Sequence, residues 1–159
     1  MDTNKLEELI NMLTDERKEL EAKKEEINNN EFEQGLAFFM EVWNLMVDYK
    51  KYFNKLGEEV KIRYKHTEIR TQKDTTWAYS LEMEKGYEWT FKYNISSECG
   101  DVEALIRKGY AQNPQMILFF LNELMEQPFE YYQNQVNKRL ADIIQKYNEK
   151  NNQLKKSLE

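Results

Sequence analysis

The chain has few residues that break regular structure or form covalent links. Five glycines and two prolines occur in 159 residues, which indicates long helices and strands joined by few turns. Cys99 is the single cysteine, so no disulfide can form within the chain and a reducing compartment is expected. At this length we expect one domain over residues 1–159, large enough to bury one hydrophobic core.

Long apolar runs are missing as well. The longest apolar stretches, GLAFFMEVWNLMV and QMILFFLNELM, are interrupted by acids, and both are shorter than the roughly 20 residues that a membrane-spanning helix needs. The chain starts with polar and acidic residues, unlike a secretory signal peptide. Lys and Asn are used heavily, as in AT-rich genomes. We therefore expect no membrane association and a cytoplasmic location in a bacterial host cell.

The residues that usually carry catalysis are scarce. His66 is the single histidine, so neither a catalytic triad nor a multi-histidine metal site can be assembled, and it is expected to be a half-buried strand residue. Cys99 would need a nearby base to act as a nucleophile, and His66 is the only histidine available. No glycine-rich phosphate loop and no calcium loop is present. We expect a protein that is not an enzyme and that holds no cofactor and no metal.

Two helices are predicted before the first strand, over about residues 3–29 and 31–56, with the triple asparagine at 28–30 between them. The first carries apolar residues at seven-residue spacing: Leu6, Leu13, Leu20 and Ile27. The positions between them turn polar after the first turns, with Glu16, Arg17, Lys23 and Lys24. This pattern is half of a coiled-coil seam.

Helices are also predicted over about residues 101–110, 114–127 and 128–157, the second of them starting at Asn113-Pro114. The last one carries two seven-residue series, Phe129, Val136, Ile143 and Leu140, Tyr147, Leu154. Residues 1–34 have a net charge of −6, and residues 131–159 a net charge of +3. We therefore predict that the terminal helices pair as an antiparallel coiled coil within one chain; pairing between chains in a homodimer is the alternative, because both arrangements bury the same seam.

Between these helices the hydrophobic period changes from helical to two residues. Strands are predicted over about 59–70, 75–83 and 87–95, joined by short turns. They would form a three-stranded antiparallel meander covered by the amphipathic helices. The predicted fold class is therefore α+β.

The loop Glu84-Lys85-Gly86 predicts the register of the second hairpin. It pairs large side chains on one face, expected to be core: Met83 with Tyr87, Leu81 with Trp89, Tyr79 with Phe91, and Trp77 with Tyr93. On the other face Glu82 lies opposite Glu88, and the first strand would bring Arg63 beside Glu82 and Lys61 beside Glu84. These charges largely cancel and leave Glu88 as the uncompensated acid.

The polar sheet face and one tyrosine are the candidate partner-binding positions. Tyrosine contributes large contact area at low entropic cost, which is why it is enriched in recognition hot spots. The candidate residues are Glu82, Glu84, Lys85, Glu88, Arg63 and Tyr131. The expected partner is a protein, and the net charge of −6 makes direct nucleic-acid binding a lesser alternative, through the basic strand Lys61 to Lys65.

The heptad ends LEELINML and VNKRLADIIQKY, on either side of the hairpin WAYSLEMEKGYEWTFKY, give the chain a family resemblance. It resembles the small phage-borne anti-CRISPR proteins that inhibit type II RNA-guided nucleases. The resemblance implies a steric inhibitor that binds a guide-RNA-loaded nuclease and holds its HNH domain away from the cleavage position, or obstructs the DNA path. The alternatives are a homodimeric coiled-coil scaffold or regulator and an accessory nucleic-acid-binding protein.

Overall fold

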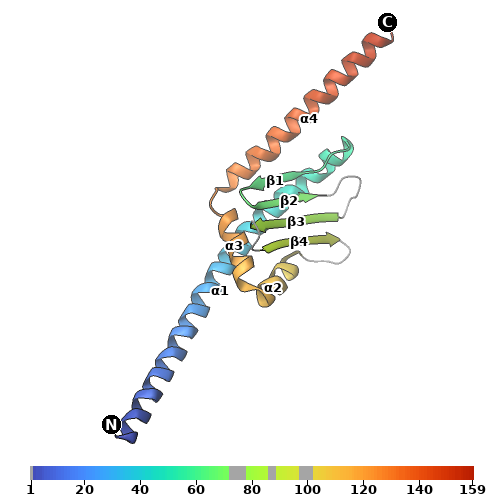
Figure 1. Ribbon diagram of the computed structural model, residues 1–159. Helices are drawn as coiled ribbons and strands as arrows, with labels where there is room; N and C mark the ends of the chain where they lie inside the picture. The colour runs from blue at the N-terminus through green and yellow to red at the C-terminus, as the bar shows by residue number, and fades with distance from the viewer. Residues whose placement is uncertain (1, 72–77, 86–88, 97–101) are drawn as a thin grey trace. The chain divides into compact units, whose positions relative to one another are not determined.

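The computed structural model describes the backbone of residues 2–71, 78–85, 89–96 and 102–159, and the side chains of residues 2–70 and 102–159 (Figure 1). The described elements follow one another along the chain as α1(Thr3–Lys55), β1(Lys61–Tyr64), β2(Thr67–Thr71), β3(Ala78–Lys85), β4(Trp89–Ser96), α2(Val102–Gln112), α3(Pro114–Leu124) and α4(Phe129–Ser157). Helices and one antiparallel sheet occur together, so the coarse α+β expectation is confirmed.

The chain divides into two compact units, Met1–Gln34 and Gly35–Glu159. The boundary falls inside α1, which is one continuous helix. The two helices expected over 3–29 and 31–56 are therefore wrong as separate elements. Asparagine in a helix interior costs less than about 1 kcal/mol relative to alanine. The triple asparagine at 28–30 does not end the helix, because no glycine or proline stands with it.

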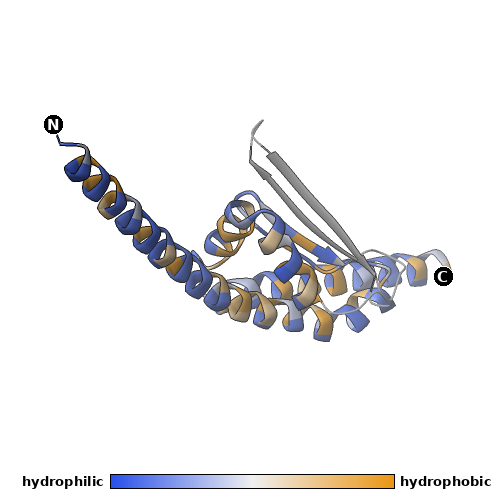
Figure 2. Ribbon diagram, turned by 90° about the horizontal axis from the view of Figure 1, so that it is seen from below, coloured by the Kyte–Doolittle hydropathy of each residue, from blue (hydrophilic) through white to orange (hydrophobic). Residues whose placement is uncertain are grey.

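In the first unit, the seven-residue series lies on a helix whose side chains are exposed. All described side chains of residues 2–27 are exposed, including Leu6 at 38% and Ile27 at 58%. Hydrophilic residues predominate here, with apolar residues recurring between them (Figure 2). The apolar seam is therefore present on this helix, but no second helix in the described part of the chain buries it. The predicted coiled coil stays a prediction.

Within the described residues the sheet has four strands in the order β1-β2-β3-β4, each antiparallel to its neighbour. The prediction of three strands is wrong, because the single strand expected over 59–70 is a hairpin. Tyr64 pairs with Thr67 across a two-residue turn, and Lys65 in that turn has a φ of 49°. This left-handed conformation is typical of tight hairpin turns, and alternating polarity in the sequence does not reveal it.

The extra hairpin changes the neighbours of the first strand. Arg63 pairs with Glu68 on β2, whereas Glu82 of β3 lies between Glu68 and Lys92. The predicted placement of Arg63 beside Glu82, and of Lys61 beside Glu84, is therefore wrong.

The register of β3 and β4 also differs from the prediction. Because β3 runs on to Lys85, which pairs with Trp89, each partner lies four positions later than predicted. The observed pairs include Met83 with Phe91, Leu81 with Tyr93, and Tyr79 with Ile95. Trp77, Tyr87 and Glu88 lie outside the described residues, and so do the side chains of β3 and β4. The inward-facing aromatic row therefore stays a prediction.

The core of the second unit forms where the later part of α1, α3 and α4 supply apolar side chains together with β1 and β2. Phe39 of α1 packs edge-on against Phe120 of α3, with ring centroids 5.6 Å apart. A Cβ atom at Gly35 would lie 2.7 Å from the Cβ atom of Leu121, so this glycine permits the close approach of the two helices. Other fully buried side chains are Met46, Phe53, Ile62, Ile69, Ile117, Leu124 and Tyr132.

Candidate functional site

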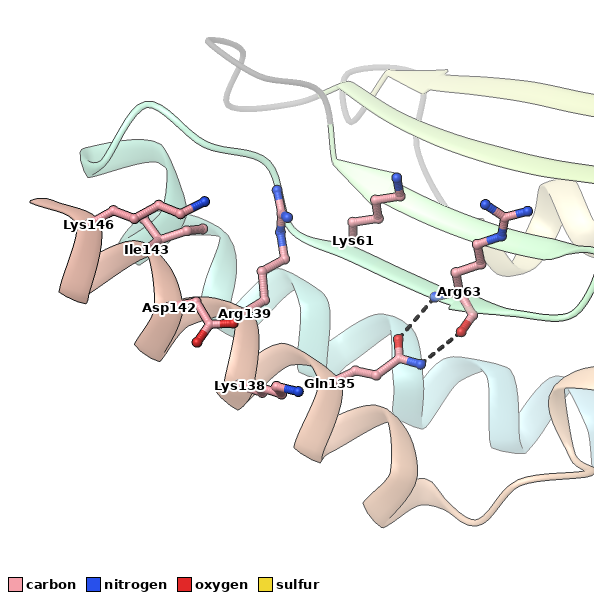
Figure 3. Close-up of a pocket in the computed structure, with 8 residues that line it drawn as sticks. All are labelled: Lys61, Arg63, Gln135, Lys138, Arg139, Asp142, Ile143 and Lys146. Atoms are coloured by element: carbon pink, nitrogen blue, oxygen red, sulfur yellow. Dashed lines mark hydrogen bonds between the residues drawn. The ribbon is translucent and has the colours of Figure 1, made fainter.

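The helix α4 covers the free edge of β1 with side chains that bind its backbone. The side-chain amide of Gln135 accepts a hydrogen bond from the backbone N–H of Arg63 at 3.0 Å and donates one to the Arg63 carbonyl at 2.8 Å (Figure 3). β1 is the first strand of the sheet, so this amide satisfies two groups that an edge strand otherwise leaves unpaired. The contact fixes the position of Arg63 relative to α4.

Two further side chains of α4 bind the backbone just before β1. The guanidinium Nε of Arg139 donates to the Glu59 carbonyl at 3.1 Å. The Tyr147 hydroxyl donates to the Leu56 carbonyl at 2.6 Å. Together with Gln135, these contacts fasten α4 over residues 56–63.

A groove of about 470 Å³ lies between β1 and α4 (Figure 3). Its charged lining is five bases and one acid, namely Lys61, Arg63, Lys138, Arg139, Lys146 and Asp142. A second hollow of about 160 Å³ shares Arg139, Ile143 and Lys146 with it and adds Glu58, Tyr147 and Lys150. We call these two hollows together the basic groove.

Only some of the cations in the basic groove have an acidic partner. The Lys61 ammonium lies 3.0 Å from a carboxylate oxygen of Glu68, and the Arg139 guanidinium lies 3.8 Å from Glu58. Arg63, Lys138 and Lys146 form no ion pair within the part of the chain whose side chains the structure describes. The groove therefore keeps a net positive charge that can attract an anion.

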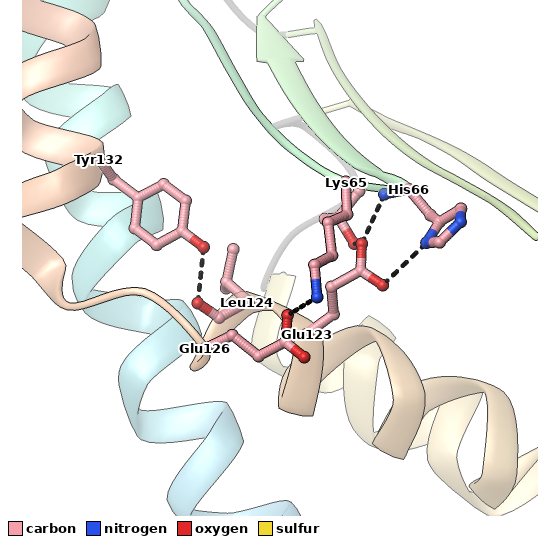
Figure 4. Close-up of polar contacts among 7 residues, drawn as sticks. Lys65, His66, Glu123, Leu124, Glu126 and Tyr132 are labelled. Carbon is pink, nitrogen blue, oxygen red and sulfur yellow. Dashed lines mark hydrogen bonds and ion pairs between the residues drawn. The ribbon is translucent and has the colours of Figure 1, made fainter.

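A second polar cluster holds the turn between β1 and β2 (Figure 4). The buried carboxylate of Glu123, on α3, accepts a hydrogen bond from the backbone N–H of His66. Its other oxygen lies 3.1 Å from the His66 ring Nδ1, and Thr67 donates its hydroxyl at 3.4 Å. His66 was expected to be a strand residue, but it lies in the turn with its side chain 47% exposed. This arrangement supports the turn and fixes the orientation of the His66 ring through Glu123.

Lys65 is held away from the basic groove by a carboxylate. Its ammonium lies 2.7 Å from an oxygen of Glu126 (Figure 4). The hydrogen bond between the two side chains raises the pKa of Lys65 and lowers the pKa of Glu126. The predicted basic strand Lys61 to Lys65 thus contributes only Lys61 and Arg63 to the groove.

Tyr131 belongs to an aromatic cluster. It is half-buried, with ring centroids 5.8 Å from Tyr64 and 5.3 Å from Tyr132. The Tyr132 hydroxyl donates to the Leu124 carbonyl at 2.6 Å (Figure 4), and burial raises the pKa of Tyr132. Tyr131, a predicted partner-binding residue, packs against Tyr132 and against Tyr64, which lies just before the turn at Lys65.

The predicted partner-binding residues are not gathered at one described place. Arg63 is exposed and lines the basic groove. Glu82, Glu84 and Lys85 lie on β3, whose side chains the structure does not describe, and Glu88 lies outside the described residues. Lys138, Arg139 and Lys146 of the basic groove were not among the predicted site residues. Their signal is a basic series along the same helix as the apolar heptads.

Among the residues whose side chains the structure describes, no group of three or more His, Cys, Asp or Glu could hold a metal ion. No described helix is both long enough and apolar enough to cross a membrane. Comparison of the chain with protein families, with curated proteins and with solved structures finds no match.

Proposed function

We propose that this protein is a protein-binding module that works without catalysis and docks on its partner through the helical segment 3–27. The observation that carries the proposal is the exposure of Leu6, Leu13, Leu20 and Ile27 at seven-residue spacing on one continuous helix. Apolar residues at this spacing stabilise a helix pair when a second helix covers them. When these apolar side chains stay exposed to water, their hydration is unfavourable in free energy.

The energetics suit a specific but reversible contact. Fully burying one leucine or isoleucine side chain contributes about 1.5–3 kcal/mol, and association itself costs at least about 4 kcal/mol. The free energy gained by burying four such residues exceeds the cost of association only modestly. The polar residues Glu16 and Lys23 interrupt the seam, and polar positions of this kind restrict the choice of partner.

The partner that we propose to test first is a type II RNA-guided nuclease, on the strength of the resemblance to anti-CRISPR proteins. Residues 1–34 carry a net charge of −6, which suits a basic protein surface such as a nuclease presents to nucleic acid. Binding at the HNH domain would block cleavage while leaving target binding intact, because cleavage needs that domain to dock.

The decisive experiment compares the wild-type protein with the seam variant Leu13→Lys/Leu20→Lys. The control variant, Asn11→Lys/Glu25→Gln, adds the same charge at exposed positions away from the seam. Nuclease cleavage and target-DNA binding are measured separately at increasing inhibitor. We expect wild type and control to suppress cleavage and the seam variant to need at least about tenfold more protein.

Unimpaired cleavage at excess wild-type protein would exclude the nuclease as partner. Equal inhibition by wild type and seam variant would show that the segment 3–27 is not the docking element.

A homodimeric scaffold is the second candidate, because α4 has a charge opposite to that of the acidic N-terminal helix and could pair with it in a second copy of the chain. Residues 131–159 have a net charge of +3, and Tyr147 and Leu154 of α4 are exposed. Light scattering tests this directly, since one chain has a mass of 19.3 kDa. A species of twice that mass that dissociates in the seam variant would support the scaffold. A species of one-chain mass at all concentrations would exclude it.

A further inference from the structure

We propose that the basic groove between β1 and α4 binds the phosphate backbone of single-stranded nucleic acid. This activity is separate from protein binding through the segment 3–27. It differs also from the basic strand suggested by the sequence, because most of the cations involved come from α4.

The cations of the groove form two banks. Lys61 and Arg63 come from β1, and Lys138, Lys146 and Lys150 come from α4. A helix rises 1.5 Å per residue, so the three lysines extend over roughly 18 Å along α4. Two banks of bases along a shared channel fit a chain with repeating negative charges.

The net charge of −6 is not spread evenly along the chain. Residues 1–34 carry all of it, and residues 35–159 contain equal numbers of acidic and basic residues. Charges farther away than about 8–10 Å are largely screened at physiological salt. Acids and bases within that distance matter most for an anion in the groove, and the lining of the groove has six bases against Asp142 and Glu58.

The groove is also built before any ligand arrives. Both backbone groups of Arg63 are held by Gln135, and Arg139 is held by the Glu59 carbonyl. Tyr147, 41% exposed, lies at the second hollow with its hydroxyl fixed on the Leu56 carbonyl. Its ring can stack on a base while the lysines contact phosphates, which is the usual combination in single-strand binding.

An acidic helix is the competing ligand, and the size of the groove disfavours it. A helix with its side chains is about 10–12 Å across, so a single turn would fill a hollow of about 470 Å³. An extended phosphate chain can instead follow the groove from β1 to Lys150.

The test uses fluorescence anisotropy of a labelled 20-nucleotide oligo(dT) with the full-length protein at salt concentrations from 20 to 200 mM. The groove variant is Lys138→Gln/Lys146→Gln. The control variant Lys5→Gln/Lys18→Gln removes two exposed lysines from the N-terminal helix. Duplex DNA and inorganic pyrophosphate are separate arms.

We expect binding by wild type and control that weakens steeply with salt, and at least a tenfold loss in the groove variant. Each phosphate contact to a single strand contributes about 0.7 to the slope of log K against log salt, so the slope of the groove variant should fall by roughly 1.4. No binding at 20 mM salt, equal losses in both variants, or binding of pyrophosphate or duplex without oligo(dT) would overturn the proposal. Dimerisation that requires Lys138 and Lys146 without oligonucleotide binding would also overturn it, in favour of an acidic helix.

Discussion

Individual polar side chains hold the second unit together by satisfying backbone groups. Tyr132 binds the Leu124 carbonyl, Glu123 binds the His66 amide, and Tyr147 binds the Leu56 carbonyl. Each bond joins residues from different elements or from their connecting loops. A buried polar group left without its partner costs about 1–3 kcal/mol, so these contacts restrict how α3, α4 and the hairpin can pack.

The buried hydroxyl of Tyr132 offers a test at one atom. Tyr132→Phe keeps the ring and removes the donor to Leu124, so we expect the free energy of unfolding to fall by about 1 kcal/mol. Urea denaturation followed by circular dichroism measures it. Tyr52→Phe, at an exposed tyrosine, should change stability by less than about 0.5 kcal/mol. Equal stability of wild type and Tyr132→Phe would contradict the bond.

The buried side chain of Lys50 predicts that the free energy of unfolding depends on pH. Its side chain is 5% exposed, and burial lowers its pKa from the ordinary value of 10.5. Between the lowered pKa and 10.5, the unfolded chain binds more protons than the folded one, so this residue makes stability rise with pH in that window.

Lys50→Met removes the buried charge, and we expect the free energy of unfolding at pH 7 to be higher than in wild type. Because the wild-type penalty disappears as the lysine deprotonates, the advantage should shrink as pH approaches 10.5. Urea titrations at several pH values measure both effects. The exposed neighbour variant Lys51→Met should show neither, and a constant or growing advantage of Lys50→Met would contradict the assignment.

Among the elements, α4 has the most varied role. Its first turns supply the core with Tyr132 and Val136, and its side chains fasten the edge strand β1. Its last turns, residues 144–157, are exposed. One helix therefore both completes the core and provides one of the two banks of cations in the groove.

The contact of α4 with β1 depends on Gln135. In Gln135→Ala, both backbone groups of Arg63 lose their partner, and we expect a loss of about 1–2 kcal/mol in the free energy of unfolding. Hydrogen exchange should also speed up at the Arg63 amide. Gln133→Ala, on the same helix, serves as the control. Unchanged protection of Arg63 would mean that the edge does not depend on this amide.

For the whole molecule, charge and apolar surface are divided between the two units. The first unit carries the net negative charge and the exposed seam; the second is neutral overall and carries the basic groove. This division is the basis for proposing two binding activities with separate chemistry.

That separation predicts that a variant can lose one of the two binding activities and keep the other. The seam variant Leu13→Lys/Leu20→Lys should lose protein partners and bind oligo(dT) within about twofold of its control, which carries the same added charge. The groove variant Lys138→Gln/Lys146→Gln should do the reverse. Light scattering and anisotropy on the same preparations measure both. Loss of both activities in either variant, with stability intact, would show that one surface serves both ligands.

The sequence predicted a good part of the elements. Asn113 caps α3 as expected, its side chain accepting from the Met116 amide at 3.3 Å, and α4 begins directly after Pro128. These features depend on local rules of capping and proline geometry. The hairpin at Lys65 was missed, because a left-handed lysine has no local signature.

The groove was missed for a different reason. Arg63 and Lys138 are far apart in the sequence, and their elements meet through tertiary contacts, which are the hydrogen bonds between Gln135 and Arg63 and the ring contact between Tyr64 and Tyr131. The expected pairing of Arg63 with Glu82 was wrong because it assumed one strand where the chain forms two, β1 and β2. An error at one turn thus changed every cross-strand neighbour of β1.

The sequence alone determined the spacing of the heptads, the helix starts at Asn113 and Pro128, and the division of charge along the chain, since each depends on residues within a few turns of one another. The tertiary structure decided the strand order, the burial of Tyr132 and Glu123, and the gathering of bases from β1 and α4. These depend on which distant backbone groups satisfy one another, and many registers bury similar apolar area while only a few leave no buried polar group unpaired.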